Sequence, residues 1–505
     1  MVSATVSQDA VNRAVWSACD TFRGTVDSSV YKDYVLTMLF LKYLSDVWQD
    51  HYEQYQKQYS KKTDLIEEMM KTERFQLPVE ARFSTLYARR DEPGNGERID
   101  KALHAIEDAN ISKLANVFQD ISFNANKLGE EKQKNEILKH LLQDFAKPEL
   151  DLRPSRVGNL DVIGNAYEFL IKNFASTSGK TAGEFYTPPE ISELIAELVA
   201  PQEGDEICDP ACGSASLLMK CGNQIKKAHK GSRKYALYAQ ESIGSTWALA
   251  KMNLFLHGED NHRIEWGDTI RNPKLLDGDD KLKLFDIVVA NPPFSLEKWG
   301  EDFASHDKFE RFRRGIPPKT KGDYAFILHM IETLKPKTGR MGVVVPHGVL
   351  FRGASEGKIR QKLIEENLLN AVIGLPEKLF YGTGIPAAVL IFSKHKTDTN
   401  VLFIDASKEF DAGKNQNQMN ASHIEKIVET YKNRQNVEKY AYLATFYELK
   451  ENDFNLNIPR YVDTSEEEEE IDLIAVRAER KLLKAQLEEL ELKMDGYLKE
   501  LGYGE

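Results

Sequence analysis

The chain has 505 residues, of which 41% are hydrophobic and 29% are charged, and its net charge is −12. This length predicts about three domains, and the acidic balance argues against a protein that binds nucleic acid alone through a broad basic surface. No apolar run reaches the ~18 residues of a membrane-spanning helix, and the first 20 residues lack the apolar core of a signal peptide. Four cysteines are too few for a disulfide framework, so we expect a cytoplasmic protein without membrane contact.

The first part of the chain, residues 1–155, is predicted to be a helical domain. Residues 35–44 are a dense apolar run of helix formers that is too long for a typical strand. Residues 52–71 are polar with few β-branched side chains, which predicts an exposed helix. Pro148 and Pro154 interrupt this pattern, and we place the domain boundary after them.

The second part, residues 156–464, has a different pattern, in which short β-rich runs alternate with helical segments. This alternation predicts βαβ units and an α/β domain with a doubly wound, mainly parallel sheet. Such a sheet binds ligands at the carboxyl ends of its strands. The predicted strands are 235–239, 285–290, 341–345, 371–375 and 387–392.

The last part, residues 465–505, begins with a serine and a run of five glutamates and continues with apolar residues spaced three and four apart. This heptad-like spacing predicts an amphipathic or coiled-coil helix. It could pack on its own domain, but the terminal position favours pairing with a partner helix and a role in assembly. The apolar positions are Leu473, Val476, Leu483, Leu487, Leu490, Met494, Tyr497 and Leu501.

A candidate cofactor loop lies at residues 206–218, which read as strand, tight loop and helix. Gly213 allows a backbone conformation that other residues resist, and the small residues Ser214, Ala215 and Ser216 let a ligand lie against the main chain at a helix N-terminus. An ordinary turn between a strand and a helix would look similar. No second Cys/His pair accompanies Cys208 and Cys212, so we predict packing residues and no metal.

Two acidic residues strengthen the cofactor interpretation. Glu241 follows the predicted strand 235–239, where a carboxylate can accept hydrogen bonds from both ribose hydroxyls of an adenosine. Asp268 follows the short run 263–266 and is a candidate acceptor for the adenine amino group. The basic insert 226–234 lengthens the gap between loop and acid, and we interpret it as a solvated helix end and loop.

The candidate catalytic motif is Asn291-Pro292-Pro293-Phe294, where the predicted strand 285–290 ends abruptly. A conjugated amino group is a poor nucleophile because its lone pair is delocalised into the ring. Acceptors from the Asn291 side chain and the Pro292 carbonyl can bind both amino hydrogens and favour a localised lone pair. The prolines fix the direction of the carbonyl, and Phe294 offers a face on which an extruded base can stack.

In this arrangement the chain resembles, over nearly its whole length, the modification (methyltransferase) subunits of type I restriction-modification systems, which are N6-adenine DNA methyltransferases. The segment 183–190 is similar to the family's stretch before the first strand, which holds the methionine part of S-adenosylmethionine. The loop 209–216 and Glu241 match the cofactor loop and ribose ligand, and residues 16–46 resemble the helical N-terminal domain. The resemblance implies the fold of the S-adenosylmethionine-dependent methyltransferases. The cofactor ligands it implies in the first segment are Glu184, Phe185, Tyr186, Thr187, Pro188 and Pro189, and Asp209 joins them in the loop.

The resemblance also implies a larger assembly and a target. The chain would methylate N6 of an adenine flipped out of double-stranded DNA. Two such subunits would flank one specificity subunit that reads the sequence, and a motor-nuclease subunit would join for restriction. We expect the basic stretch 308–321 to form a loop near DNA. One departure is Ala215, where related loops carry glycine; its methyl group is tolerable if φ there is negative.

Three alternatives remain at this point. The motif also serves enzymes that methylate a protein glutamine amide, although the large helical domain and coiled tail argue against this. A non-catalytic assembly subunit could keep the fold and bind the cofactor only as a structural ligand, but Asn291 and Phe294 are intact. A nicotinamide oxidoreductase shares the fold class but needs a G-x-G-x-x-G loop, which the chain lacks.

Overall fold

The structure is a computed structural model that describes residues 6–60, 62–158, 161–177, 186–278, 280–380, 384–414, 416–464 and 473–503. It divides into two compact units, Met1–Val462 and Asp463–Glu505. Within the described residues, none of the helices combines the length and the apolar character needed to cross a bilayer.

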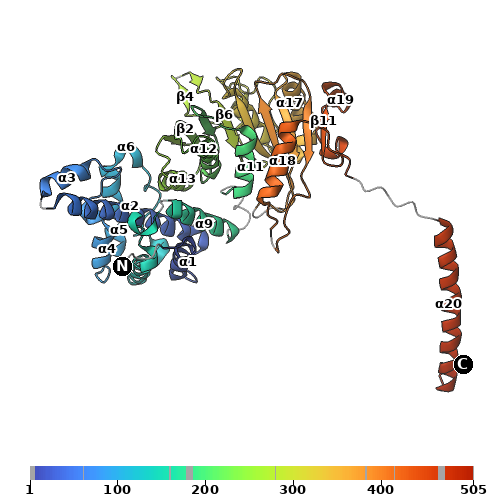
Figure 1. Cartoon of the computed structure of the whole chain (residues 1–505), viewed down its shortest axis with the longest axis horizontal. Helices are drawn as coiled ribbons and strands as arrows, with labels where there is room; N and C mark the ends of the chain where they lie inside the picture. Colours follow the sequence, from blue (N-terminus) through green and yellow to red (C-terminus); the bar gives the residue numbers. More distant parts are fainter. Residues whose placement is uncertain are drawn as a thin grey trace. The chain divides into compact units, whose positions relative to one another are not determined.

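The N-terminal region of the first unit is helical, as predicted (Figure 1). The apolar run 35–44 lies within α2 and is buried along its whole length. The helices of this N-terminal region are α1 (Gln8–Ala18), α2 (Ser28–Tyr59), α3 (Thr63–Lys71), α4 (Phe83–Ala88), α5 (Asn95–Ala109), α6 (Ile111–Leu114), α7 (Glu131–Phe145), α8 (Pro154–Val157) and α9 (Asp161–Thr177), with 3-10 turns η1 (Cys19–Thr21), η2 (Val79–Ala81), η3 (Asn126–Leu128) and η4 (Pro148–Leu150).

The prediction of one exposed helix over residues 52–71 is wrong. Helix α2 continues to Tyr59, Ser60 then takes a left-handed conformation with φ +49°, and a separate helix α3 begins at Thr63. A left-handed residue cannot continue a right-handed helix, so the chain turns there. Tyr52 and Tyr55 are also partly buried against the core rather than exposed.

The prediction of a mainly parallel sheet is confirmed. The sheet has nine strands in the order β11-β10-β8-β9-β7-β6-β1-β2-β3, in which β9 and β11 run antiparallel to their neighbours. The strands are β1 (Glu206–Asp209), β2 (Ala236–Glu241), β3 (His262–Trp266), β6 (Ile287–Ala290), β7 (Arg340–Pro346), β8 (Leu369–Gly374), β9 (Ala387–Ser393), β10 (Val401–Asp405) and β11 (Ala441–Ala444), and β4 (Leu276–Asp277) and β5 (Lys281–Leu282) form a separate hairpin.

Helices cover both faces of the sheet, because successive strand residues point to opposite sides. On β6, Ile287 and Val289 belong to one core, whereas Val288 and Ala290 belong to the other. The first core is closed by α11, α12, α13 and α18, and the second by α15, α16 and α17; Figure 1 shows α11 and α18 in front of the strands. The helices are α11 (Pro189–Val199), α12 (Ser216–Ala228), α13 (Gly244–Leu256), α14 (Glu301–Ala304), α15 (Asp323–Glu332), α16 (Gly348–Phe351), α17 (Ala354–Glu365), α18 (Ala421–Asn433) and α19 (Phe446–Glu451), and the 3-10 turn η6 is Ile458–Arg460.

The helical region packs on the sheet region through α13, which contacts α2 and α9. Arg74 strengthens this junction: its Nη2 donates to the Phe255 carbonyl at 2.8 Å and its Nε to Asp260 at 2.9 Å. The rings of Phe75 and Phe255 pack edge to face, with centroids 5.2 Å apart. The core of the helical region is therefore continuous with the face of the sheet that α13 covers.

The second unit contains one long helix, α20 (Leu473–Glu500), which covers the predicted heptad positions from Leu473 to Tyr497. None of its residues is buried, and its apolar side chains are well exposed, with Leu490 at 62% and Met494 at 58%. A single amphipathic helix in water has nothing to cover its apolar stripe. The predicted glutamate run lies outside the described residues.

Candidate active site

The site lies where the strand order of the sheet reverses. Strands β1 and β6 are adjacent and parallel, and from them the chain builds β2 and β3 on one side and β7 on the other. The loops that leave β1 and β6 therefore diverge and open a crevice at the carboxyl edge, which is the usual ligand site of a doubly wound sheet. The candidate cofactor loop leaves β1 and the candidate catalytic motif leaves β6.

The cofactor loop has a defined backbone shape. Asp209, the last residue of β1, accepts a hydrogen bond from the Ala211 N–H at 3.0 Å, which turns the chain as it leaves the strand. Gly213 then adopts φ +52°, and Ala215 adopts φ +64° immediately before α12. The sequence-based condition that φ at Ala215 be negative is thus not met: a non-glycine residue occupies a left-handed position, which costs roughly 1 kcal/mol.

Glu241, at the end of β2, holds this loop directly. Its Oε2 accepts the Gly213 N–H at 3.0 Å, and its Oε1 accepts the Ile243 N–H at 2.9 Å. A carboxylate can accept about four hydrogen bonds, so acceptor capacity remains on the side away from the loop. Burial raises the pKa of Glu241, and the backbone N–H groups oppose that shift.

Asp268 lies close to Glu241, because the N–H of the preceding residue, Gly267, donates to the Glu241 backbone carbonyl at 2.8 Å. One Asp268 oxygen accepts the N–H groups of Ile270 and Arg271 at 2.8 and 3.0 Å. Its side chain is 44% exposed, and its second oxygen lies 3.9 Å from Arg271 Nε. The fold thus brings Gly213, Glu241 and Asp268 together at the ends of neighbouring strands.

The catalytic motif begins directly after β6. Asn291 Nδ2 donates to Thr187 Oγ1 at 3.1 Å. Asn291 Oδ1 is buried, and among the described residues no donor reaches it. A buried amide oxygen without a donor costs about 1–3 kcal/mol, so it needs an explanation such as a ligand's hydrogen. Pro292 is buried, and the half-buried Phe294 ring packs against Phe380 with centroids 5.8 Å apart at 66°.

The segment predicted to precede the first strand is only partly described. Glu184 and Phe185 lie outside the described residues. Tyr186 is buried at 3% exposure, and Pro188 and Pro189 lead into α11, with proline in its first turn. Thr187 contacts the catalytic motif through its hydroxyl, which accepts from Asn291.

Several supporting residues were not found from the sequence. Asn253 on α13 is fully buried, and its Nδ2 donates to the Ser214 carbonyl at 2.9 Å. Ser216 Oγ lies 3.2 Å from Glu168 of α9, so the helical region also supports the cofactor loop. Ile243, next to Glu241, is 55% exposed. An asparagine within the apolar run 247–256 was the one signal that the sequence offered.

Asp209 is the most perturbed carboxyl of the site. It is 2% exposed, and burial together with the nearby charge of Glu241 raises its pKa to about 8. Near neutral pH the protonated form is therefore substantially populated. A neutral Asp209 avoids placing two buried negative charges side by side beneath the loop.

The basic stretch 308–321 is less available than predicted. Arg311 and Arg314 are buried, at 1% and 3% exposure. Arg311 forms an ion pair with Asp307 at 2.8 Å, and Arg314 pairs with Glu332 at 2.5 Å and Glu366 at 2.6 Å. These arginines hold the loop together, and contact with DNA would depend on its exposed lysines.

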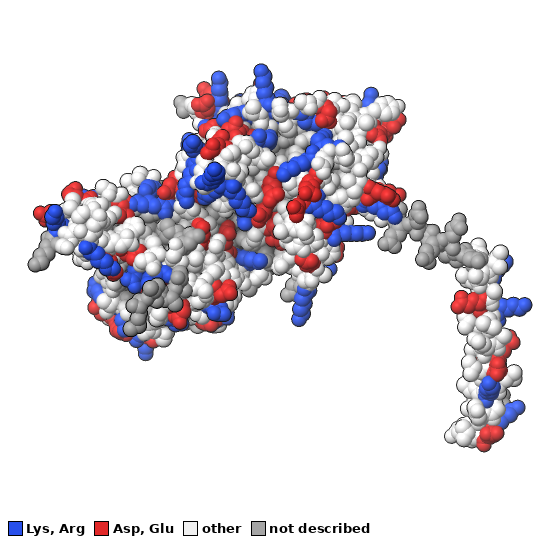
Figure 2. Space-filling model, viewed as in Figure 1, with Lys and Arg blue, Asp and Glu red and all other residues white. Residues whose placement is uncertain are grey.

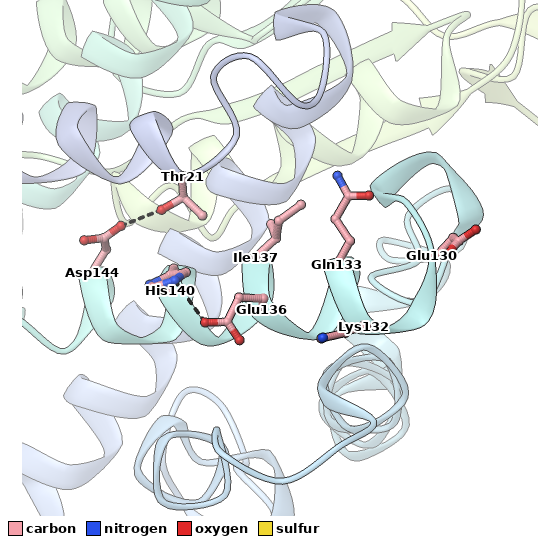
Figure 3. Close-up of a pocket in the computed structure, with 8 residues that line it drawn as sticks. All are labelled: Thr21, Glu130, Lys132, Gln133, Glu136, Ile137, His140 and Asp144. Carbon is pink, nitrogen blue, oxygen red and sulfur yellow. Dashed lines mark hydrogen bonds and ion pairs between the residues drawn. The ribbon is translucent and has the colours of Figure 1, made fainter.

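A hollow of about 770 Å³ lies elsewhere, on α7 of the helical region (Figure 3). Four of its polar side chains form two pairs: Thr21 donates to Asp144 at 2.7 Å, and His140 lies 3.2 Å from Glu136. None of its lining residues belongs to the carboxyl edge of the sheet, and we assign the chemistry to that edge rather than to this hollow.

Comparison with known proteins agrees with this geometry. Residues 158–470 match the N-6 DNA Methylase family, and residues 11–145 match the HsdM N-terminal domain. The methylase subunit of the type I restriction enzyme MjaVII from Methanocaldococcus jannaschii is 31% identical over 97% of this chain and 84% of that protein. The corresponding MpnII subunit from Mycoplasma pneumoniae is 30% identical over 93% of this chain and 92% of that protein. A type I restriction-modification methyltransferase subunit from Streptococcus thermophilus has a similar structure, with a TM-score of 0.81 and 36% identity over 91% of this chain and all of that chain.

Proposed function

The chain belongs to the N-6 DNA methylase family, as a methylase subunit of the type I restriction-enzyme kind, and we propose that its target is the N6 amino group of an adenine in double-stranded DNA. It is a DNA methyltransferase, and S-adenosylmethionine is its methyl donor. The observation that supports an amino-group target is the buried Asn291 oxygen, for which the described residues provide no donor, and the match to the N-6 DNA methylase family supports adenine as the base.

Asn291 is suited to an amino group with two hydrogens. Its Nδ2 is held by Thr187, which leaves Oδ1 as the free end of the amide. An amino hydrogen donated to Oδ1, with the second donated to the Pro292 carbonyl, would localise the nitrogen lone pair toward the methyl donor. The Phe294 ring, supported by Phe380, would stack on a base extruded from the duplex.

The residues of the neighbouring loop fit the methyl donor. The left-handed Gly213 and the buried, small Ser214 and Ala215 leave the main chain open to a ligand. Glu241 is held in place by two backbone N–H groups and keeps acceptor capacity for ribose hydroxyls. S-adenosylmethionine supplies an electrophilic methyl group on a positively charged sulfur. The protein's contribution is to orient the nucleophile and exclude water.

The chain functions in a multisubunit assembly, and we propose its partners. A specificity subunit would choose the sequence, with two methylase subunits on each, and a motor-nuclease subunit would join for restriction. Basic and acidic side chains are interspersed over the face of the first unit in Figure 2, which suits a protein whose partner provides much of the DNA contact. The exposed apolar stripe of α20 is the proposed docking element for the specificity subunit.

Label transfer tests the target. The chain, co-expressed with its specificity subunit, is incubated with methyl-labelled S-adenosylmethionine and unmethylated DNA, and the DNA is digested to nucleosides. We expect the label in N6-methyladenine. Label in cytosine would refute the choice of base, label in protein would favour a glutamine amide target, and binding of cofactor without transfer would favour a non-catalytic assembly subunit.

Deletion of the tail tests the assembly. Removing residues 465–505 should weaken association with the specificity subunit, because the described apolar stripe of α20 is lost. Size-exclusion chromatography of the co-expressed proteins measures this. An unchanged complex would reject the docking role of the tail.

A further inference from the structure

The chain leaves the catalytic motif in a strained conformation. Ser295 follows Phe294 and adopts φ +52°, in the left-handed region. For a non-glycine residue this conformation costs roughly 1 kcal/mol and persists only where neighbouring contacts hold it. Neither Ser295 nor its contacts were singled out by the sequence.

Asp323 supplies the contacts that hold Ser295. The Ser295 N–H donates to Asp323 Oδ1 at 2.7 Å, and its hydroxyl lies 3.4 Å from Asp323 Oδ2. Next to this pair, the Gly322 N–H donates to the Leu296 carbonyl at 3.0 Å. The segment after the motif is thus pinned to the start of α15 at two consecutive positions.

Asp323 is itself fixed by a partly buried cation, Arg352. Asp323 is 3% exposed, and Arg352 Nη2 donates to its Oδ2 at 2.8 Å. Arg352 Nε lies 3.3 Å from the carboxylate of Glu356, which is 2% exposed. A buried carboxylate needs such partners to remain in one place, because an unpaired charge would draw water or a proton into the site. The contacts of Arg352 with Asp323 and Glu356 thus join α15 to the start of α17.

We propose that Asp323, held by Arg352, is a positioning residue for methyl transfer: by locking Ser295 it fixes the path of residues 292–294. This inference rests on the proposed function. The Pro292 carbonyl and the Phe294 ring lie within three residues of the locked Ser295, and Asn291 is anchored on the other side by Thr187. The motif is therefore held at both ends, and release of one end would displace the carbonyl that binds the second amino hydrogen.

The chain offers a matched control at the other end of the same strand. Asp286, just before β6, also accepts a backbone N–H, from Glu206 at 2.9 Å, and pairs with a cation, Lys335 at 2.8 Å. It lies at the amino edge of the sheet, away from the motif. Asp323→Ala and Asp286→Ala therefore remove comparable contacts, and only the first releases the motif.

The test measures turnover, cofactor affinity and hydrogen exchange on the complex co-expressed with its specificity subunit. We expect Asp323→Ala to lower kcat by about 10- to 100-fold, the size of effect that misplacement by about 1 Å produces, with the Kd for S-adenosylmethionine changed less than about threefold. Asp323→Asn, which keeps an acceptor for the Ser295 N–H, should lose less activity. Asp286→Ala should retain kcat per folded molecule.

Hydrogen exchange separates failure of this inference from failure of the proposed function. Peptides that cover residues 291–296 should exchange faster in Asp323→Ala than in wild type, and not in Asp286→Ala, whether or not adenine is the target. Equal exchange and equal kcat in the two alanine variants would overturn the positioning role. If Asp323→Ala does not fold, Arg352→Gln, which removes the cation that fixes Asp323, takes its place, and full kcat with unchanged exchange at residues 291–296 would overturn the positioning role.

Discussion

Replacing Asn291 with alanine should separate catalysis from stability. Truncation removes the Nδ2 bond to Thr187 (3.1 Å), a loss of about 0.5–1.5 kcal/mol. It also removes the buried Oδ1 that no described donor reaches, a gain of about 1–3 kcal/mol. The two terms roughly cancel, so the free energy of unfolding should stay the same or rise slightly. Loss of one preorganised group should lower kcat by about 100- to 1,000-fold.

Asn110 provides the contrasting variant. It is buried, and all of its side-chain polar atoms are bonded: Oδ1 accepts the Gln76 N–H, and Nδ2 donates to the carbonyls of Gln76 and Ile106, each at 2.8 Å. Asn110→Ala should lose about 2–4 kcal/mol of stability and keep its activity per folded molecule. Thermal unfolding, cofactor binding and methyl transfer to DNA are measured on both. Retained transfer by Asn291→Ala, or destabilisation as large as that of Asn110→Ala, would refute the reasoning.

Three further predictions concern the cofactor loop. Glu241→Gln should weaken S-adenosylmethionine binding about 10- to 100-fold in calorimetry, because the backbone N–H of either Gly213 or Ile243 loses its acceptor. An unchanged Kd would contradict this prediction. Ala215→Gly should change the free energy of unfolding by less than about 1 kcal/mol, since relief of the left-handed strain offsets the loss of the buried methyl group. Ala215→Val should lower it by more than about 2 kcal/mol. Similar changes in the two variants would contradict the positive φ of Ala215. Burial raises the pKa of Asp209 to about 8, so the stability that its protonated form contributes is lost as pH rises toward and through that value. The Tm of Asp209→Asn relative to wild type should therefore increase from about pH 5 to about pH 8. Parallel Tm profiles of the two proteins would contradict this prediction.

The fold could be predicted where a strand is buried on both faces. Residues 285–290 and 341–345 are nearly continuous β-branched or apolar runs, and they appear as β6 and β7 at the centre of the sheet. The antiparallel strand β11 was not predicted: its four residues, 441–444, carry only a short apolar pattern, and pairing with β10 defines them. The break after Tyr59 was also missed, because no glycine or proline marks the left-handed Ser60.

The residues of the candidate site that would contact the ligands could be predicted from the sequence, but the residues that hold them in position could not. Asn291, Gly213 and Glu241 stand directly at strand ends, where residue type and position together indicate a ligand site. Asp323 lies 28 positions after Ser295, and no local pattern links an acidic residue at a helix start to the end of a distant motif. Such contacts depend on how the sheet places its loops, which a single sequence does not display.

Two buried amide oxygens at the site lack a hydrogen-bond donor among the described residues, so they lower the stability of the free protein and are available to a ligand. Among the described residues, the buried asparagine oxygens without a donor belong to Asn253 and Asn291, and each residue uses its Nδ2 to hold a neighbouring segment of the site. Elsewhere, as at Asn110, a buried asparagine bonds all of its polar atoms. An unsatisfied oxygen destabilises the free protein, and that cost is recovered when a ligand donates a hydrogen. Binding of an amino group at Asn291 should therefore stabilise the protein as well as activate the nucleophile, which couples occupancy of the site to the rigidity of the edge that performs the reaction.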